Sequence, residues 1–445
     1  MSFQTARAAA VSERLTAQAY DSGLNVSHDT WNGMGVGSDG RVYYVLCSES
    51  LDVGAQMFSF DPSTCRIRRL GDLTEACGEK GLKSIPQGKS HVAFVEHEGK
   101  LYFATHLAYY NPGGGDPSAK EMKATAPDGY KPYPGGHFLA YDMAKGTFHR
   151  LASVSQGEGI LTMNMDASRG RLYGLTWPTG YFLRYDLATG QLKQFPPVAG
   201  RGEAGDGATY STLCRSIVID PGDGSAYLTT SAGDILRYRY DGDRLETVAH
   251  DNLRKDYFGT YDSTQPGHMG YNWRQAVWYP AEKRIYGVHG NSGYLFRFDP
   301  RAGRVEVLDR LTSKPSQRSG MKDKFRYGYL GFTLGPDGRT LYYLTGGPIP
   351  AGEKPQRGKA EIEGPEENLH LVTYDIPAAR YRDHGPVFFA DGQRAWGVHS
   401  IAVGADGTVY ALSRIVRKGR IARDLIAIPP VKRAAEEEGT IGAAE

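Results

Sequence analysis

Two histidines bracket one short stretch of the chain, KSHVAFVEHEGKLYFATH, which spans residues 89–106. The turn HEGK between two apolar runs is typical of a β-hairpin. In such a hairpin His91 begins the first strand and His106 ends the second, so both imidazoles lie at its open end. Because imidazole exchanges protons near neutral pH, this pairing indicates acid–base chemistry.

Further residues extend this set. Arg215 begins the apolar stretch RSIVID, and His399 begins HSIAV. A guanidinium binds a carboxylate through two parallel hydrogen bonds, whereas imidazole and phenol groups transfer protons. The candidate catalytic residues are His91, His106, Arg215, Tyr271 and His399. The candidate substrate-binding residues are Asn32, Trp177, Tyr210, His268, Arg274, Gln275, His289 and Trp396.

An internal repeat supplies a fold that would bring these distant residues together. A unit made of an apolar strand, an Asp- and Gly-rich turn and a Tyr-containing strand occurs seven times, as in GMGVGSDGRVYYV and SIAVGADGTVYAL. Repeats about as long as one four-stranded blade are typical of a β-propeller, an all-β fold. The tyrosines that align the units are Tyr43, Tyr102, Tyr173, Tyr227, Tyr286, Tyr342 and Tyr410.

A second hairpin, such as FLRYDLATGQLKQF, follows six of the seven units. After the seventh unit only RIARDLIAIPP remains, so the last blade needs one more strand, which the stretch from Leu15 to Tyr20 can supply. We therefore expect a seven-bladed β-propeller whose ring is closed by N- and C-terminal strands, because closure leaves no sheet edge exposed. The alternative is an open array of seven sheets, which would expose two edges.

The repeat predicts a single domain over residues 1–430, because no linker interrupts it. A Gly- and Pro-rich insertion occupies residues 107–136, and loops of this length are often functional. The remaining residues, 431–445, are rich in charged and small side chains and are expected to form a flexible tail.

Propeller geometry places the candidate residues on one face. The first strand of each blade lines the central channel, and chain direction alternates from strand to strand. The start of every first strand and the end of every second strand therefore open on the same face. The residues aligned at strand starts include Asn32, His91, Arg215, Gln275 and His399. Those at or next to strand ends include His106, Trp177 and His289.

The composition argues against several classes of partner. The net charge of +2 is too close to zero for a nucleic-acid-binding surface. No apolar run is long enough to span a membrane. Four cysteines in 445 residues match neither a zinc motif nor a disulfide framework. The start of the chain lacks the apolar stretch of a signal peptide, so we expect a cytoplasmic location.

The predicted ring combines cations with proton-transferring groups. No aligned ring position is Asp or Glu, which argues against a calcium or magnesium site and against hydrolysis by paired carboxylates. Three histidines suit zinc, but nothing in their spacing requires it, so we predict no metal and no cofactor. These parts fit β-elimination from a uronic acid. Arginine stabilises the enolate-like intermediate, and His or Tyr removes the C5 proton.

The same residues resemble those of a known family. The segments HVAFVEHEGKLYFATH, RLYGLTWPTGYFLRYDLATG and CRSIVID are similar to segments of the seven-bladed propeller polysaccharide lyases, which include ulvan lyases and rhamnose–glucuronate lyases. The resemblance covers about residues 28–420. It implies that His91 and His106 match the family's catalytic histidine pair and that Arg215 neutralises the substrate carboxylate. The catalytic tyrosine stays open among Tyr173, Tyr210 and Tyr271.

Three functions remain open on the sequence alone. We favour a lyase that acts on an anionic oligosaccharide. A propeller hydrolase of the lactonase type would need Glu, Asn and Asp around a divalent metal, and the ring offers only Asn32. A non-catalytic propeller that binds a sugar or a protein would keep Trp177 and Trp396 but would not need paired imidazoles.

Overall fold

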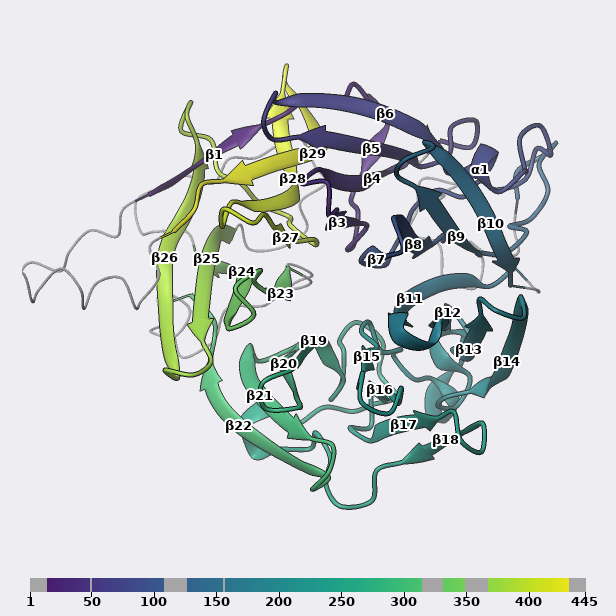
Figure 1. The fold of residues 1–445 in the computed structure, drawn as a ribbon, viewed down its shortest axis with the longest axis vertical. Helices are drawn as coiled ribbons and strands as arrows, with labels where there is room; N and C mark the ends of the chain where they lie inside the picture. Colours follow the sequence, from purple (N-terminus) through teal and green to yellow (C-terminus); the bar gives the residue numbers. More distant parts are fainter. Residues whose placement is uncertain are drawn as a thin grey trace, which may run out of the picture.

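The computed structural model describes residues 14–48, 50–107, 126–154, 157–313, 331–348 and 367–431. Most of the predicted insertion, residues 108–125, and most of the predicted tail, residues 432–445, lie outside these ranges. Within them the regular structure is mainly β-strand, in small sheets that stand around a common centre (Figure 1). The protein is a β-propeller, as the repeat predicts.

Each of the first five sheets is built from consecutive strands. The first holds β2 (Ser27–His28), β3 (Met34–Val36), β4 (Val42–Ser48), β5 (Gln56–Asp61) and β6 (Arg66–Asp72). The second holds β7 (Val95–His97), β8 (Lys100–Ala104), β9 (His137–Asp142) and β10 (Thr147–Ser153). The third holds β11 (Gly159–Asp166), β12 (Arg171–Trp177), β13 (Tyr181–Asp186) and β14 (Gln191–Pro197).

Two further sheets follow the same plan. The fourth holds β15 (Val218–Ile219), β16 (Ala226–Thr229), β17 (Ile235–Arg239) and β18 (Arg244–Thr247). The fifth holds β19 (Trp273–Tyr279), β20 (Arg284–His289), β21 (Tyr294–Asp299) and β22 (Arg304–Arg310). The helices of the described residues are α1 (Leu73–Ala76) and the 3₁₀ turns η1 (Ala167–Arg169), η2 (Gly202–Ala204), η3 (Gly207–Thr209) and η4 (Asp256–Phe258). None of these is long and apolar enough to cross a membrane.

The last sheet has eight strands and joins the two ends of the chain. Its order is β23 (Phe332–Leu334), β24 (Thr340–Pro348), β25 (Glu367–Asp375), β26 (Arg380–Phe389), β1 (Leu15–Ala19), β29 (Arg420–Ile428), β28 (Val409–Arg417) and β27 (Ala402–Val403). The N-terminal strand β1 runs antiparallel to β29 and parallel to β26. The stretch predicted to supply a strand beside RIARDLIAIPP therefore pairs there.

The innermost strands of neighbouring sheets contact one another near the centre of Figure 1. β11 contacts β15, β15 contacts β19, β19 contacts β23, and β27 contacts β3. The second strand of each unit belongs to a sheet that packs between two neighbouring sheets. It is therefore buried on both faces, and its sequence is a nearly continuous apolar run. Outer strands such as β6 and β10 have many exposed positions and carry the charged residues.

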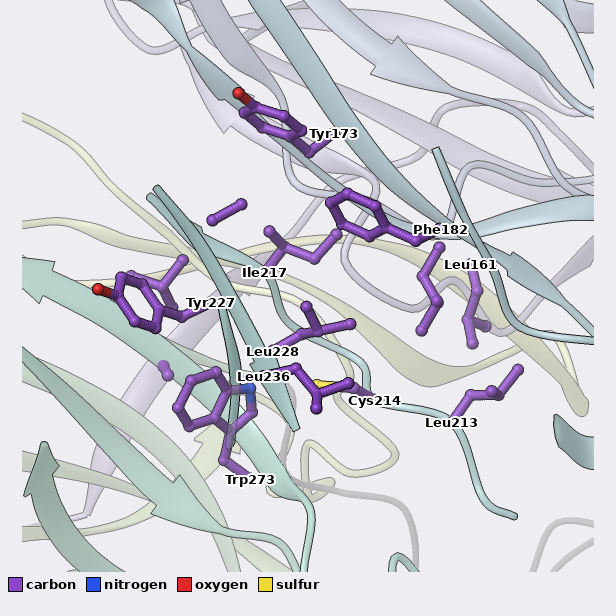
Figure 2. Packing of buried hydrophobic residues seen from close by; sticks show 14 of the residues in the cluster. Leu161, Tyr173, Phe182, Leu213, Cys214, Ile217, Tyr227, Leu228, Leu236 and Trp273 are labelled. Carbon is purple, nitrogen blue, oxygen red and sulfur yellow. The ribbon is translucent and has the colours of Figure 1, made fainter. Parts of the chain in front are cut away.

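The aligned tyrosines occupy equivalent places. All seven are buried, and each lies on the second strand of its repeat unit, as the repeat predicts. Figure 2 shows two of them, Tyr173 and Tyr227, in the core between the third, fourth and fifth sheets. The indole N–H of Trp273, on β19, donates to the carbonyl of Ser216 at 2.9 Å and so links the fourth and fifth sheets. The six predicted second hairpins are also present, as β5/β6, β9/β10, β13/β14, β17/β18, β21/β22 and β25/β26.

The hairpin around the two histidines differs from the prediction at its open end. Its first strand, β7, covers only Val95–His97, and Lys89, not His91, pairs with His106. The intervening segment leaves its own hairpin and bonds to the first sheet. The amide of Gly33 donates to the carbonyl of Val92, and the amide of Phe94 donates to that of Met34.

Candidate active site

Trp31 stands between two of the predicted histidines. Its ring lies 5.8 Å from that of His91 and 5.1 Å from that of His399, and both pairs are stacked. All three side chains are buried. Trp31 follows β2, His91 precedes β7, and His399 precedes β27, so three sheets contribute to one stack. Two imidazoles that are far apart in the sequence thus contact the same indole.

His106 lies beside His91, with ring centroids 5.9 Å apart, and Trp177 lies 5.3 Å from His106. We call these residues the histidine cluster: Trp31, His91, His106, Trp177 and His399. The ring of His106 packs against Gly159 at the start of β11. A Cβ at Gly159 would lie only 2.7 Å from Nδ1 of His106, so a side chain there would displace the imidazole. The Nδ1 atoms of His91 and His106 are buried and have no hydrogen-bond partner among the described residues.

Cations surround this cluster. The ammonium of Lys89 lies 4.9 Å from the centre of the Trp31 ring, within range of a cation–π contact. Burial lowers the pKa of His91 and of His106 well below the ordinary value, and the positive charges of Lys89 and Arg215 lower both further. Both imidazoles are therefore neutral near pH 7. The cluster thus places neutral proton acceptors close to cationic side chains.

Glu203, on η2, connects Arg215 to the histidine cluster. Its Oε1 accepts from Nη2 of Arg215 at 2.7 Å and from the amide of Leu213 at 3.1 Å. Its Oε2 accepts from the indole N–H of Trp177 at 2.8 Å. Arg215 also donates from Nη1 to the carbonyl of Leu213 at 2.8 Å. A carboxylate from a connecting segment therefore holds two of the predicted site residues together.

Asn32 ties several sheets together at the centre. Its φ of 58° is left-handed, a conformation that Asn tolerates better than most residues. Its side-chain amide donates to the carbonyl of His91 at 3.2 Å, and its backbone amide donates to that of His399 at 2.9 Å. Its Oδ1 accepts from Nε2 of Gln275, on β19, at 3.2 Å. Asn32 and Gln275, both predicted to bind substrate, thus bond to each other.

A second carboxylate, Asp29, lies near His399. It is buried and accepts from Nε of Arg414 at 2.8 Å and from Nε of Arg423 at 3.3 Å. Burial alone would raise the pKa of Asp29, but the hydrogen bond and charge of Arg414 outweigh burial and hold that pKa below its ordinary value. Asp29 therefore carries a negative charge on the His399 side of the cluster.

Several predicted residues form a separate aromatic group around the start of β19. The ring of Tyr261 lies 5.4 Å from both His268 and Tyr271, and the hydroxyl of Tyr271 accepts from the amide of Tyr261 at 3.1 Å. His289 is fully buried and stacks on Phe258 at 4.2 Å, and burial lowers its pKa to about 3. In the described part of the chain no hydrogen bond or ring contact joins Tyr271 to the histidine cluster.

The remaining predicted residues have different surroundings. Arg274 is buried on β19, and its charge contributes to the lowered pKa of His91. Tyr210 is half-buried, and its hydroxyl hydrogen-bonds that of Thr212 at 3.2 Å. The backbone of Trp396 pairs with that of Arg414 in a single antiparallel β-bridge. Of these, Arg274 is the one that acts electrostatically on the cluster.

Sequence reasoning missed Trp31, Lys89, Glu203 and Asp29. Two of these carried a signal. Trp31 immediately precedes Asn32, and Lys89 stands two residues before His91, where an extended chain returns to the same side. Glu203 and Asp29 lie in connecting segments that no strand alignment covers. The ring positions are free of carboxylates, as the alignment states, yet carboxylates reach the site from these segments.

Two cavities border the first sheet. One of about 360 Å³ is lined in part by Gln56, Arg69 and Asp72, and one of about 280 Å³ in part by Asp72 and Glu79. Gln56 bonds to both Asp72 and Arg69, so these polar groups already satisfy one another. We take the histidine cluster as the candidate site, because predicted residues from several sheets contact one another there. No group of three or more His, Cys, Asp or Glu side chains in the described ranges is arranged to hold a metal ion.

No family model matches the chain, and no curated protein is matched to it by sequence. Among solved structures, it is similar to a protein from Bacteroides uniformis described as a candidate 6-phosphogluconolactonase, with 14% identity, a TM-score of 0.47 and coverage of 84% of this chain and 93% of that one. It is also similar to a chain of the mitotic checkpoint complex, with 9% identity, a TM-score of 0.50 and coverage of 96% of each chain. At such identity this second likeness concerns the fold alone.

Proposed function

We propose that the histidine cluster binds an acidic sugar and cleaves the glycosidic bond at O4 of a uronic acid by β-elimination. One observation carries the proposal. Burial and nearby cations keep His91 and His106 neutral, so proton acceptors stand where a carboxylate would be attracted. A site for a neutral sugar would gain nothing from the charges of Lys89, Arg215 and Arg274.

The reaction balances with these groups alone. An imidazole takes the C5 proton, and the electron pair of the C5–H bond spreads towards the carboxylate as an enolate-like intermediate. Lys89 and the arginines stabilise the added negative charge. The C4–O4 bond then breaks, a C4=C5 double bond forms, and the imidazolium gives the proton taken from C5 to the leaving oxygen, which restores the neutral imidazole. We place the base at His91 or His106, since both are neutral and within 5.9 Å of each other.

We further propose that seven blades form a ring closed by β1, as in the propeller polysaccharide lyases that the sequence resembles. The seven aligned tyrosines on seven second strands and the pairing of β1 with β29 support this. Closure would bear on the site, since His399 precedes β27 in the sheet that β1 joins, and Trp31 follows β2 in the first sheet.

The test is incubation with a panel of uronate-containing oligosaccharides while near-ultraviolet absorbance is recorded. Elimination leaves a conjugated unsaturated uronide that absorbs there, and we expect the absorbance to rise with at least one member of the panel. Hydrolysis would release reducing ends without absorbance. Binding without turnover, measured by calorimetry on the same panel, would instead leave a sugar-binding propeller, and either result would overturn the proposal.

A further inference from the structure

The carboxylate of Glu203 faces three donors from two directions and leaves no oxygen without a partner. Oε1 meets Arg215 and the amide of Leu213, and Oε2 meets the indole N–H of Trp177. The side chains of Glu203 and Arg215 are only 12% and 14% exposed, so their ion pair is shielded from water and salt. Through these hydrogen bonds, Glu203 joins η2 to β12 and to the segment before β15.

We propose that Glu203 is a positioning residue that fixes Arg215 and Trp177 as one wall of the histidine cluster and offsets the charge of Arg215. The inference rests on the proposed function and adds to it how the carboxylate-binding arginine is held. Trp177 lies 5.3 Å from His106, so a shift of the indole reaches the imidazole directly. Arg215, in turn, keeps one guanidinium edge on Glu203 and on Leu213.

The charge of Glu203 has a predictable direction of effect on His106. Among the described residues, the charged or titratable groups near this imidazole include His91, Lys89 and Arg215, and Glu158 precedes Gly159, against which the ring packs. The carboxylate of Glu158 accepts from Thr176 and Thr179. Removing the charge of Glu203 leaves Arg215 uncompensated and makes the potential more positive, whereas removing Arg215 makes it less positive.

The contact itself is tested without substrate. The chain has five tryptophans, so the amide–proton correlation spectrum of the nitrogen-15-labelled protein has five indole signals, and Trp177→Phe identifies one. We expect Glu203→Gln to move the Trp177 signal upfield, because a hydrogen bond to a carboxylate is stronger than one to an amide. The matched control is Glu306→Gln. Glu306 lies on the outer strand β22 and pairs with Arg297 on β21. A Trp177 signal that stays in place in Glu203→Gln would overturn the inference.

The effect on turnover is tested by the pH profile of kcat/KM. In Glu203→Gln the acid limb should move to lower pH, on the order of one unit, and in Arg215→Gln it should move to higher pH. A merely structural role would not give opposite shifts, so parallel shifts contradict the proposed role. If the wild-type protein turns over no uronide, the proposed function fails, while the indole spectrum still decides whether Glu203 holds Trp177.

Discussion

At the scale of single residues, the histidine cluster pairs neutral bases with cations. An imidazole surrounded by positive charge is a weaker base than a free one, but it is unprotonated over a wider pH range. In the proposed reaction, the cations that weaken this base would also stabilise the anionic intermediate. This compensation favours removal of a proton beside a carboxylate.

His91→Gln tests the role of the first imidazole. Loss of a general base lowers turnover by about a hundredfold to ten-thousandfold, and we expect kcat/KM for the active uronide to fall within this range. His97→Gln is the matched control, since His97 ends β7 and its side chain is 25% exposed beside Glu98. Equal activity of His91→Gln and the wild-type protein would remove His91 from the mechanism.

Lys89→Met tests the electrostatic part of the account. The charge of Lys89 contributes to the lowered pKa of both His91 and His106, so its removal should raise both. The acid limb of the kcat/KM profile should then move to higher pH, on the order of one unit. Lys193→Met is the control, because Lys193 makes a similar contact, 4.7 Å from the ring of Phe195, on the outer strand β14. An unmoved limb in Lys89→Met would contradict the charge argument.

At the scale of elements, the periodic parts of the chain were predictable and the aperiodic parts were not. The strands around Tyr173 and Tyr227 follow from alternation, turn residues and repeat spacing. The pairing of Lys89, rather than His91, with His106 does not follow from these signals. The backbone of Val92 and Phe94 bonds to the first sheet rather than to its own hairpin. Glu203 lies on a short 3₁₀ turn with no periodic signal, so only the fold places it.

The N-terminal strand β1 offers a test at this scale. Ala17 is buried between β26 and β29, whereas its neighbour Thr16 is exposed, because alternate residues of a strand face opposite sides. Ala17→Asp should lower the free energy of unfolding by about 2–4 kcal/mol, since it buries a charge. Thr16→Asp should change it by less than about 0.5 kcal/mol. Urea titration measures both, and equal values would mean that β1 does not pack as described.

At the scale of the whole molecule, burial of neutral histidines makes stability depend on pH. The pKa values of His91, His106 and His289 are lowered in the folded protein, so below about pH 6.5 the unfolded chain binds more protons at these sites. The stability that these three histidines contribute is therefore fully present above this pH and is lost as the pH falls. Each histidine contributes up to about 1.4 kcal/mol per pH unit to the slope of the free energy of unfolding against pH.

His289 is the clearest case, because its folded pKa is about 3 and its window runs from about pH 6.5 down to that value. We expect His289→Gln to be less stable at pH 7, since the stacking on Phe258 is lost, but to lose stability less steeply on acidification. His149→Gln, exposed on β10, should leave the slope unchanged. Urea unfolding at several pH values between 7 and 4.5 gives the slopes, and identical slopes in His289→Gln and the wild-type protein would contradict this account.

The fold and the meeting of His91, His106 and His399 could be anticipated from the sequence because both follow from strand periodicity and radial packing. The aromatic group around Tyr271 could not be separated from the cluster in advance, since its residues lie in a long connection whose path only packing decides. Figure 1 shows that the innermost strands β3, β7, β11, β15 and β27 stand around the same centre. The residues of the cluster lie after β2 and β8, before β7 and β27, and on β12.

Elimination by this cluster is distinguished from hydrolysis by mass spectrometry of the products formed in water enriched in heavy oxygen. We expect the products together to have the mass of the substrate, with heavy oxygen absent from them. Products that together gain one water, with heavy oxygen at the new reducing end, would contradict it.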